Sequence, residues 1–361
     1  MFGERLRLAR KKAGLSLRAL VEQLEGRVSA QALGKYERGQ MMPSSEVLLA
    51  LCKVLEISPD YLFSDRVQAL ASVEFRKRAR TSAKERYRVE AQVIDQVERY
   101  LAVEEILELP SHEWQEPFPA VRIESEEEAE ALAEELRREW GLGEDPLPNM
   151  TELLEEQGLK VLLSDLPNNV SGLTCLVRRG QGHLPLPVVV VNKSHSLERR
   201  RLTLAHELGH RLLSDDSPVD EEKACHRFAA AFLVNKDHLI RKMGPHRNGL
   251  SYEELLGLKR YFRVSAAAFL LRLRDIGVID QSTMTYVFQT VARSWRREEP
   301  DPLEVRGEHH EQPKRFERLC YRALAEHYIS LSKAIELLKK PIVDIEEAIK
   351  GPDSAQANYC Q

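Results

Sequence analysis

Residues 197–213 of the 361-residue chain read LERRRLTLAHELGHRLL and carry two histidines four positions apart, His206 and His210. Positions i and i+4 lie on one face of a helix, so both imidazoles can reach one metal ion. Glu207 lies beside that face, where its carboxylate can accept a proton from water without being a ligand. Leucines surround the motif on several sides, which indicates a buried helix. Two histidines and a glutamate buried together need a partner, and a metal ion provides one.

The next helix is expected at residues 220–233 and offers a third ligand. It reads DEEKACHRFAAAFL, and its apolar residues, Cys225 among them, define an inward face. Glu222 lies three residues before Cys225 and shares that face, so it could meet the first helix side by side. His226 lies one turn beyond Glu222 and is an alternative ligand, or a group that supports a ligand from behind. Two histidines, one carboxylate and an open fourth position are typical of a catalytic zinc site.

The first 63 residues carry a different pattern, a series of short helices separated by turns. Glycines end successive segments, and Ser16 and Ser29 stand where a serine caps the next helix. Residues 1–40 contain nine lysines and arginines against four glutamates, a local charge of +5, although the whole chain carries −4. An anionic partner is therefore expected at this end of the chain.

Composition restricts the class of protein. The chain is 43% hydrophobic and 30% charged, and it has no apolar run of ~18 residues, so no membrane span is expected. The start, MFGERLRLARKKAG, does not resemble a signal peptide. The five cysteines are far apart and form no CxxC pair. This argues against a disulfide framework or a cysteine zinc site and favours a cytoplasmic protein.

The segments RRRLTLAHELGHRLL and EKACHRFAAAFLVN resemble the ImmA/IrrE family of bacterial metallopeptidases, and the resemblance extends over about residues 123–240. It implies one Zn²⁺ per chain and cleavage of a partner repressor or another regulatory protein. The site residues that it implies are the metal ligands His206, His210 and Glu222 and the catalytic base Glu207. Cys225 and His226 stand where the family often has Ala-Asn, and Asn235 where it often has Pro. The first departure could alter the surroundings of the ligands, but neither removes a ligand.

Residues 3–63 resemble the phage-repressor-like (Xre) helix-turn-helix family. In that fold the third helix enters the major groove of double-stranded DNA, and its first residues meet base edges. The DNA-contacting residues that this implies are Ser29 and Gln31 for bases and Arg18, Lys35 and Arg38 for phosphates. Gln31 has the shape for a bidentate contact to adenine. Such domains usually read paired half-sites, which favours a homodimer.

These patterns together predict a mainly α fold with a small β-sheet (α+β). Strands are expected at LKVLL, SGLTCLVR and PVVVVN, before the metal helix. We expect four parts: a five-helix repressor-like helix-turn-helix domain at 1–66, a helical linker at 67–122, a zincin-like metallopeptidase domain at 123–279 and a helical C-terminal region at 280–361. The strand region 171–191 could offer an edge to an extended peptide substrate, provided that no other element covers it.

Two functions remain open at this stage. In the first, the chain is a DNA-binding transcriptional regulator with a zinc-dependent endopeptidase domain, which cleaves a regulatory protein in a stress, mobile-element or toxin–antitoxin context. In the second, it is a transcriptional repressor or antitoxin-like binding protein, and its peptidase fold is a non-catalytic sensor or scaffold. Glu207 discriminates between them, because only the first function needs its carboxylate.

Overall fold

The computed structural model of the chain describes residues 2–64, 66–71, 83–109, 114–180, 184–295, 298–306 and 311–350. The chain forms two compact units. Unit 1 comprises residues 1–113, 175–188 and 313–361, and unit 2 comprises residues 114–174 and 189–312.

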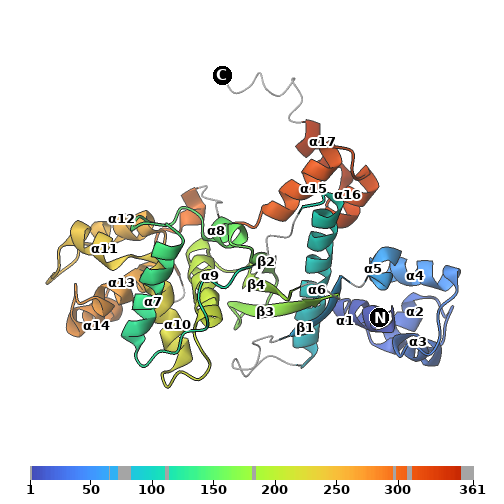
Figure 1. Ribbon diagram of the computed structural model, residues 1–361, viewed down its shortest axis with the longest axis horizontal. Helices are drawn as coiled ribbons and strands as arrows, with labels where there is room; N and C mark the ends of the chain where they lie inside the picture. The colour runs from blue at the N-terminus through green and yellow to red at the C-terminus, as the bar shows by residue number, and fades with distance from the viewer. Residues whose placement is uncertain are drawn as a thin grey trace. The chain divides into compact units, whose positions relative to one another are not determined.

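Figure 1 labels the α-helices and strands of both units. Those of unit 1 are α1 (Phe2–Lys12), α2 (Leu17–Gln23), α3 (Ala30–Glu37), α4 (Ser45–Leu55), α5 (Pro59–Phe63), β1 (Val67–Ala71), α6 (Ala83–Ile106), α15 (Arg315–Ala325), α16 (Leu331–Leu338) and α17 (Ile342–Lys350). Those of unit 2 are α7 (Glu126–Glu139), α8 (Met150–Glu156), β2 (Lys160–Ser164), α9 (Leu197–Leu212), α10 (Glu221–Leu233), α11 (Lys236–Met243), α12 (Tyr252–Phe262), α13 (Ala266–Asp275), α14 (Gln281–Gln289) and the 3₁₀ helix η1 (Leu303–Arg306). The strands β3 (Gly172–Arg179) and β4 (Leu186–Asn192) contribute residues to both units.

Five short helices, α1 to α5, form the N-terminal domain, as the sequence predicts. Ser16 and Ser29 cap α2 and α3, and their hydroxyls accept backbone hydrogen bonds of 3.0 and 3.1 Å. Each helix contributes a leucine with no exposed surface to one core: Leu6, Leu20, Leu33, Leu51 and Leu62. The caps fix where each helix starts, and the leucines fix which face turns inward.

A strand, β1, lies in the linker that the sequence predicts to be helical, so the helix prediction for residues 67–71 is wrong. β1 pairs antiparallel with β3, with Leu70 opposite Val177. Pairing with a strand a hundred positions away overrides the helix propensity of its alanine and leucine residues. The rest of the predicted linker helix is present from Ala83 onward as α6, which packs against α1 and α15.

The C-terminal helices α15, α16 and α17 confirm the predicted helical region. They enclose a small core with the end of α6, to which Val103, Cys320, Leu337 and Ile345 contribute buried side chains. α6 is therefore shared between the N-terminal domain and the C-terminal helices within unit 1.

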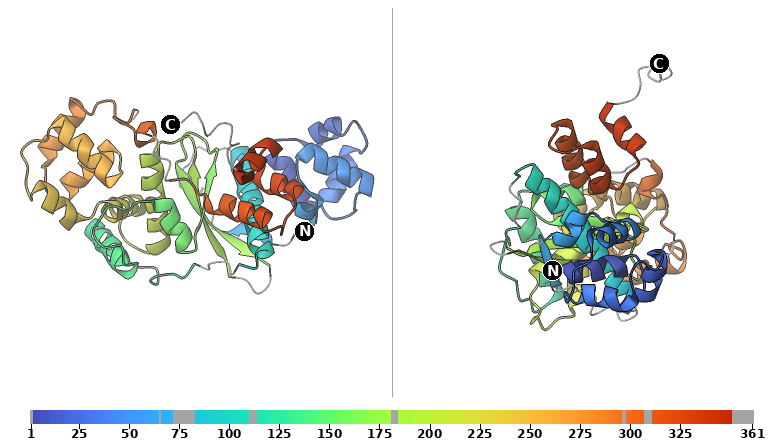
Figure 2. Two further views of the ribbon diagram at one scale, coloured as in Figure 1. Left: turned by 90° about the horizontal axis from the view of Figure 1, so that it is seen from above. Right: turned by 90° about the vertical axis from the view of Figure 1, so that its right-hand side faces the viewer.

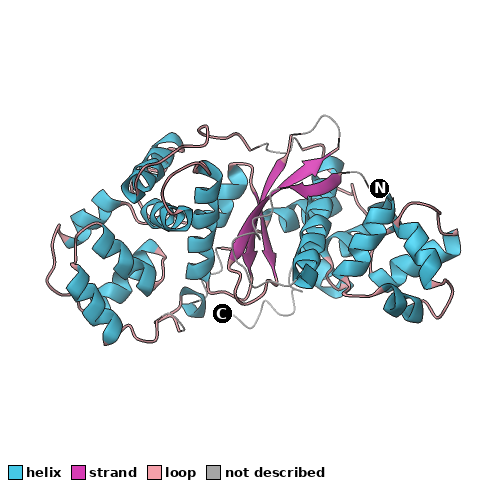
Figure 3. Ribbon diagram, turned by 90° about the horizontal axis from the view of Figure 1, so that it is seen from below, coloured by secondary structure: helices cyan, strands magenta, loops and turns pink. Residues whose placement is uncertain are grey.

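The four strands form one sheet in the order β1-β3-β4-β2. Figure 3 shows the strands in magenta. The predicted strands are confirmed as β2, β3 and β4, and every residue of β4 is buried. β3 and β4 are inner strands, and β1 pairs with residues 176–179 of β3. The sequence-based proposal of an open edge across residues 171–191 therefore fails where β1 covers β3.

In unit 2, α10 packs against both α7 and α9, and the three helices lie side by side (Figures 1 and 2). Leu132, Leu208 and Phe228 meet in the core that they share. Residues 252–275 form two helices, α12 and α13, because Arg263 adopts a left-handed φ of 55° and Ser265 caps α13.

Two further expectations bear on the class of protein. In the described ranges, no helix is long and apolar enough to cross a membrane. Cys52, Cys175, Cys225 and Cys320 are buried thiols, and Cys360 lies outside the described residues.

Candidate metal centre and nucleic-acid interface

The HELGH motif lies in α9, which is buried over most of its length. Ser196 caps the helix by accepting a hydrogen bond of 3.4 Å from a first-turn backbone N–H. Leu204 and Leu208 have no exposed surface and anchor the helix in the core of unit 2. His206 and His210 lie one turn apart on the same helix, and the side chain of each is only 3% exposed.

α10 lies directly against α9, and the glycine of the motif permits the close approach. A Cβ atom at Gly209 would lie 3.3 Å from both Cys225 Cα and Phe228 Cδ1. Asp220 caps α10 by accepting a backbone hydrogen bond of 3.0 Å. The first turn of α10, which carries two consecutive glutamates, is thereby fixed beside the histidines.

Donor atoms of His206, His210 and Glu222 all lie within 4.8 Å of one another. The two Nε2 atoms are 3.1 Å apart, and Glu222 oxygens lie 3.3 Å from His206 Nε2 and 3.6 Å from His210 Nε2. Ligands ~2.1 Å from a tetrahedral zinc ion are ~3.4 Å from one another. The three separations fit such an ion. The side chain of Glu222 is 40% exposed, so the group can be reached from solvent.

Glu221 contacts the other nitrogen of His210. Its Oε1 lies 2.6 Å from His210 Nδ1, so that nitrogen carries the proton and donates to the carboxylate. The lone pair is then on Nε2, which faces Glu222. A carboxylate behind a ligating histidine fixes its tautomer and raises its basicity. His226 is exposed, and its ring lies 4.3 Å from that of His206, at the border of the three-donor group.

Glu207 lies under the start of β3 and is 2% exposed. A Cβ atom at Gly172 would lie 3.6 Å from Glu207 Oε1, 2.9 Å from the Val190 carbonyl oxygen and only 2.5 Å from Thr203 Cγ2. The glycine therefore allows the strand to approach α9 closely enough to enclose the Glu207 carboxylate.

The residues predicted to contact DNA lie on the surface of the N-terminal domain: Arg18, Ser29, Gln31, Lys35 and Arg38 are all exposed. Gln31 and Lys35 lie one turn apart on α3, while Leu33 and Tyr36 turn its other side into the core. On another side of this domain, α1 packs against α6.

Two family models match separate parts of the chain. Residues 6–62 match the model described as Helix-turn-helix, and residues 154–274 match a peptidase model described as IrrE N-terminal-like domain. Repressor protein C2 of Salmonella phage P22 is 44% identical over 62 residues, which make up 17% of this chain and 28% of the repressor. The chain joins an Xre-type helix-turn-helix domain to an IrrE-like peptidase domain. The IrrE-like domain contains His206, His210, Glu207 and Glu222, and the helix-turn-helix domain contains all the predicted DNA-contacting residues.

Sequence reasoning singled out neither Glu221 nor Gly172. In the IrrE-like domain Glu221 contacts His210 because the start of α10 lies beside the end of α9. The spacing of residues within a single helix does not reveal such a contact. Two consecutive carboxylates at the start of a helix were the available signal. For Gly172 the signal was a glycine opening a strand, which often marks a close backbone approach.

Proposed function

We propose that the IrrE-like domain is a zinc-dependent endopeptidase and that the chain cleaves a repressor or another regulatory protein. The observation that supports this most is the spacing of the Nε2 and carboxylate atoms of His206, His210 and Glu222, which suits a tetrahedral ion. Two histidines and one carboxylate leave a fourth position for water or substrate, as catalysis requires and a structural site does not.

Each residue has a defined part in this proposal. His206 and His210 would hold zinc through Nε2, and Glu222 would hold it through its carboxylate. Zinc bound there would polarise the substrate carbonyl as a Lewis acid and make water nucleophilic at neutral pH. Glu207 would take the proton of the attacking water as the new C–O bond forms. It would deliver that proton to the leaving nitrogen as the C–N bond breaks.

The helix-turn-helix domain would direct this activity. We infer that it binds double-stranded DNA, with the exposed residues of α3 in the major groove and the local charge of +5 attracting phosphates. Paired half-sites would favour a homodimer. Binding at an operator would bring the peptidase close to other regulators of the same DNA. The peptidase would then meet few other proteins, which suits limited proteolysis in a stress, mobile-element or toxin–antitoxin setting.

The cleavage claim is tested by comparing new protein N-termini after treatment of a soluble extract from the source organism. The zinc-loaded full chain and its Glu207→Gln variant are each added, and N-terminal peptides are identified by mass spectrometry. The variant keeps the ligands and loses the base. We expect a few new N-termini, in a DNA-binding regulator, with the unaltered chain and none with the variant. The same termini with both proteins would contradict the proposal and favour a scaffold role for the domain.

A further inference from the structure

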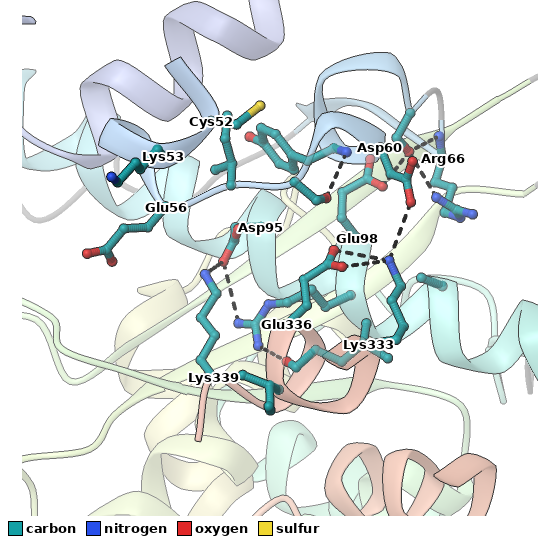
Figure 4. A pocket seen from close by; sticks show the side chains of 18 residues that line it. Cys52, Lys53, Glu56, Asp60, Arg66, Asp95, Glu98, Lys333, Glu336 and Lys339 are labelled. Carbon is teal, nitrogen blue, oxygen red and sulfur yellow. Dashed lines mark hydrogen bonds and ion pairs between the residues drawn. The ribbon is translucent and has the colours of Figure 1, made fainter. Parts of the chain in front are cut away.

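Unit 1 contains a cavity of about 400 Å³, and none of the residues of the metal centre lines it (Figure 4). Three parts of unit 1 line it: the chain from α4 to β1, the middle of α6, and α16 with its C-terminal cap. Its volume is within the range of small-molecule sites, ~300–1,000 Å³. The lining is rich in charged side chains, and the balance of those charges indicates what could bind.

Three cations converge on one buried carboxylate, Asp95 of α6, whose side chain is 8% exposed. Lys12 Nζ lies 2.8 Å from Oδ1, while Lys339 Nζ and an Arg99 nitrogen lie 2.7 and 3.4 Å from Oδ2. The Lys339 contact is visible in Figure 4. Three positive charges face one negative charge, so the group around Asp95 has a surplus of two; Arg99 and Lys339 line the cavity, and Lys12 lies behind Asp95.

A second group of charges, around Lys333, has the opposite balance. Lys333 lies 3.0 Å from Glu336 and 3.5 Å from Asp60, so two carboxylates face one cation there. Glu98 pairs with Arg5, and Arg66 pairs with Glu105 outside the lining. Cations therefore outnumber carboxylates around Asp95, and carboxylates outnumber the cation at Lys333.

This surplus is unfavourable without a further anion. Burial lowers the pKa of Lys12 to about 8. The attraction of Asp95 does not offset this lowering, and the repulsion of Lys339 adds to it. Nε of Arg99 is buried without a hydrogen-bond partner among the described residues. A second anion would supply both the negative charge and the acceptor atoms that this group lacks.

We propose that the cavity binds a small phosphate-bearing anion through Lys339 and Arg99, with Lys12 adding its charge across Asp95. A phosphate group carries about −1.5 to −2 at pH 7 and three acceptor oxygens, which matches a surplus of two better than a carboxylate does. Lys12 belongs to α1 of the helix-turn-helix domain, Arg99 to α6 and Lys339 to the end of α16. A ligand there would fasten the DNA-binding domain to α6 and the C-terminal helices, as an effector site would.

The proposal is tested by isothermal titration calorimetry of the full chain with inorganic phosphate and, separately, with AMP, at constant ionic strength. Lys339→Gln should weaken binding by about tenfold or more, the usual effect of removing a charged hydrogen-bond donor. Lys333→Gln is the matched control, because it changes the same residue type in the same cavity where two carboxylates, Glu336 and Asp60, face the lysine, and it should leave affinity nearly unchanged. Asp95→Asn removes the competing carboxylate and should tighten binding.

The two ligands distinguish the source of the phosphate group. Tighter binding of AMP would identify a nucleotide, and equal binding would identify a phosphate group recognised alone. Absence of binding to the unaltered chain, beyond that of acetate at the same ionic strength, would overturn the proposal. Equal weakening by Lys333→Gln and Lys339→Gln would also overturn it, since general attraction to positive charge would then explain the heat. The site lies in unit 1, so neither result depends on peptidase activity.

Discussion

At the scale of single residues, Glu221 decides which nitrogen of His210 can hold a metal ion. Its carboxylate occupies Nδ1 at 2.6 Å and leaves Nε2 facing Glu222. We expect Glu221→Gln to lower zinc affinity by about 10–100-fold, the usual effect of losing a partner behind a ligand, while the fold is retained. Competition with a chelating dye measures the affinity. Glu253→Gln changes an exposed first-turn glutamate of α12 and should have no effect. Equal affinity in Glu221→Gln and the unaltered chain would refute this role.

Gly172 is a second residue that the close packing of β3 against α9 requires. A Cβ atom there would lie 2.5 Å from Thr203 Cγ2 and 2.9 Å from a backbone oxygen, so β3 or α9 must move. We expect Gly172→Ala to destabilise the protein by ~1–3 kcal/mol, as overpacking does. Gly257→Ala is the matched control, because that position lies inside α12 with nothing within 4 Å of the new Cβ. It should be stabilising by up to ~1 kcal/mol. Chemical denaturation compares the two, and similar values would contradict the account.

At the scale of elements, α3 presents two polar side chains one turn apart, Gln31 and Lys35, both exposed. If α3 lies in the major groove, Lys35→Ala should weaken binding to all DNA sequences and reduce the salt dependence of log K by about one unit of slope. Gln31→Ala should instead relax the preference at one base pair. Fluorescence anisotropy at several salt concentrations measures both. Lys236→Ala, an exposed cation of α11, is the control. An unchanged salt slope in Lys35→Ala would exclude the phosphate contact.

Elements set by local chemistry could be predicted from the sequence. Serine caps marked the starts of α2 and α3, and helical spacing of histidines and leucines marked α9 with its two candidate metal ligands. Elements set by distant partners could not. β1 is a strand because β3 supplies its hydrogen bonds, and its own residues do not favour that conformation. For the same reason the pairing of Glu221 with His210, which joins two helices, needed the structure.

At the scale of the molecule, Asp95 of α6 joins parts of unit 1 that are far apart in the sequence, because it pairs with Lys12 and Lys339. Burial raises the pKa of Asp95, but Arg99, Lys12 and Lys339 together outweigh it and hold the pKa below its ordinary value. The stability contributed by this carboxylate is therefore present above the unfolded pKa of about 3.9 and is lost as the pH falls through the folded value. Hydrogen exchange of peptides from α1, α6 and α16 between pH 6 and 3 follows this loss. The opening free energy should fall more steeply with acid in the unaltered chain than in Asp95→Asn. Parallel pH profiles would contradict the assignment.

We propose that His206, His210 and Glu222 of the IrrE-like domain hold one zinc ion on which Glu207 acts. The most direct test is the metal content of the purified full chain by elemental analysis, beside Glu207→Gln and His206→Ala. We predict about one zinc per chain in the unaltered protein and in Glu207→Gln, and none in His206→Ala. A folded, unaltered protein that holds no zinc after the metal is added back, or a His206→Ala variant that keeps it, would contradict the account.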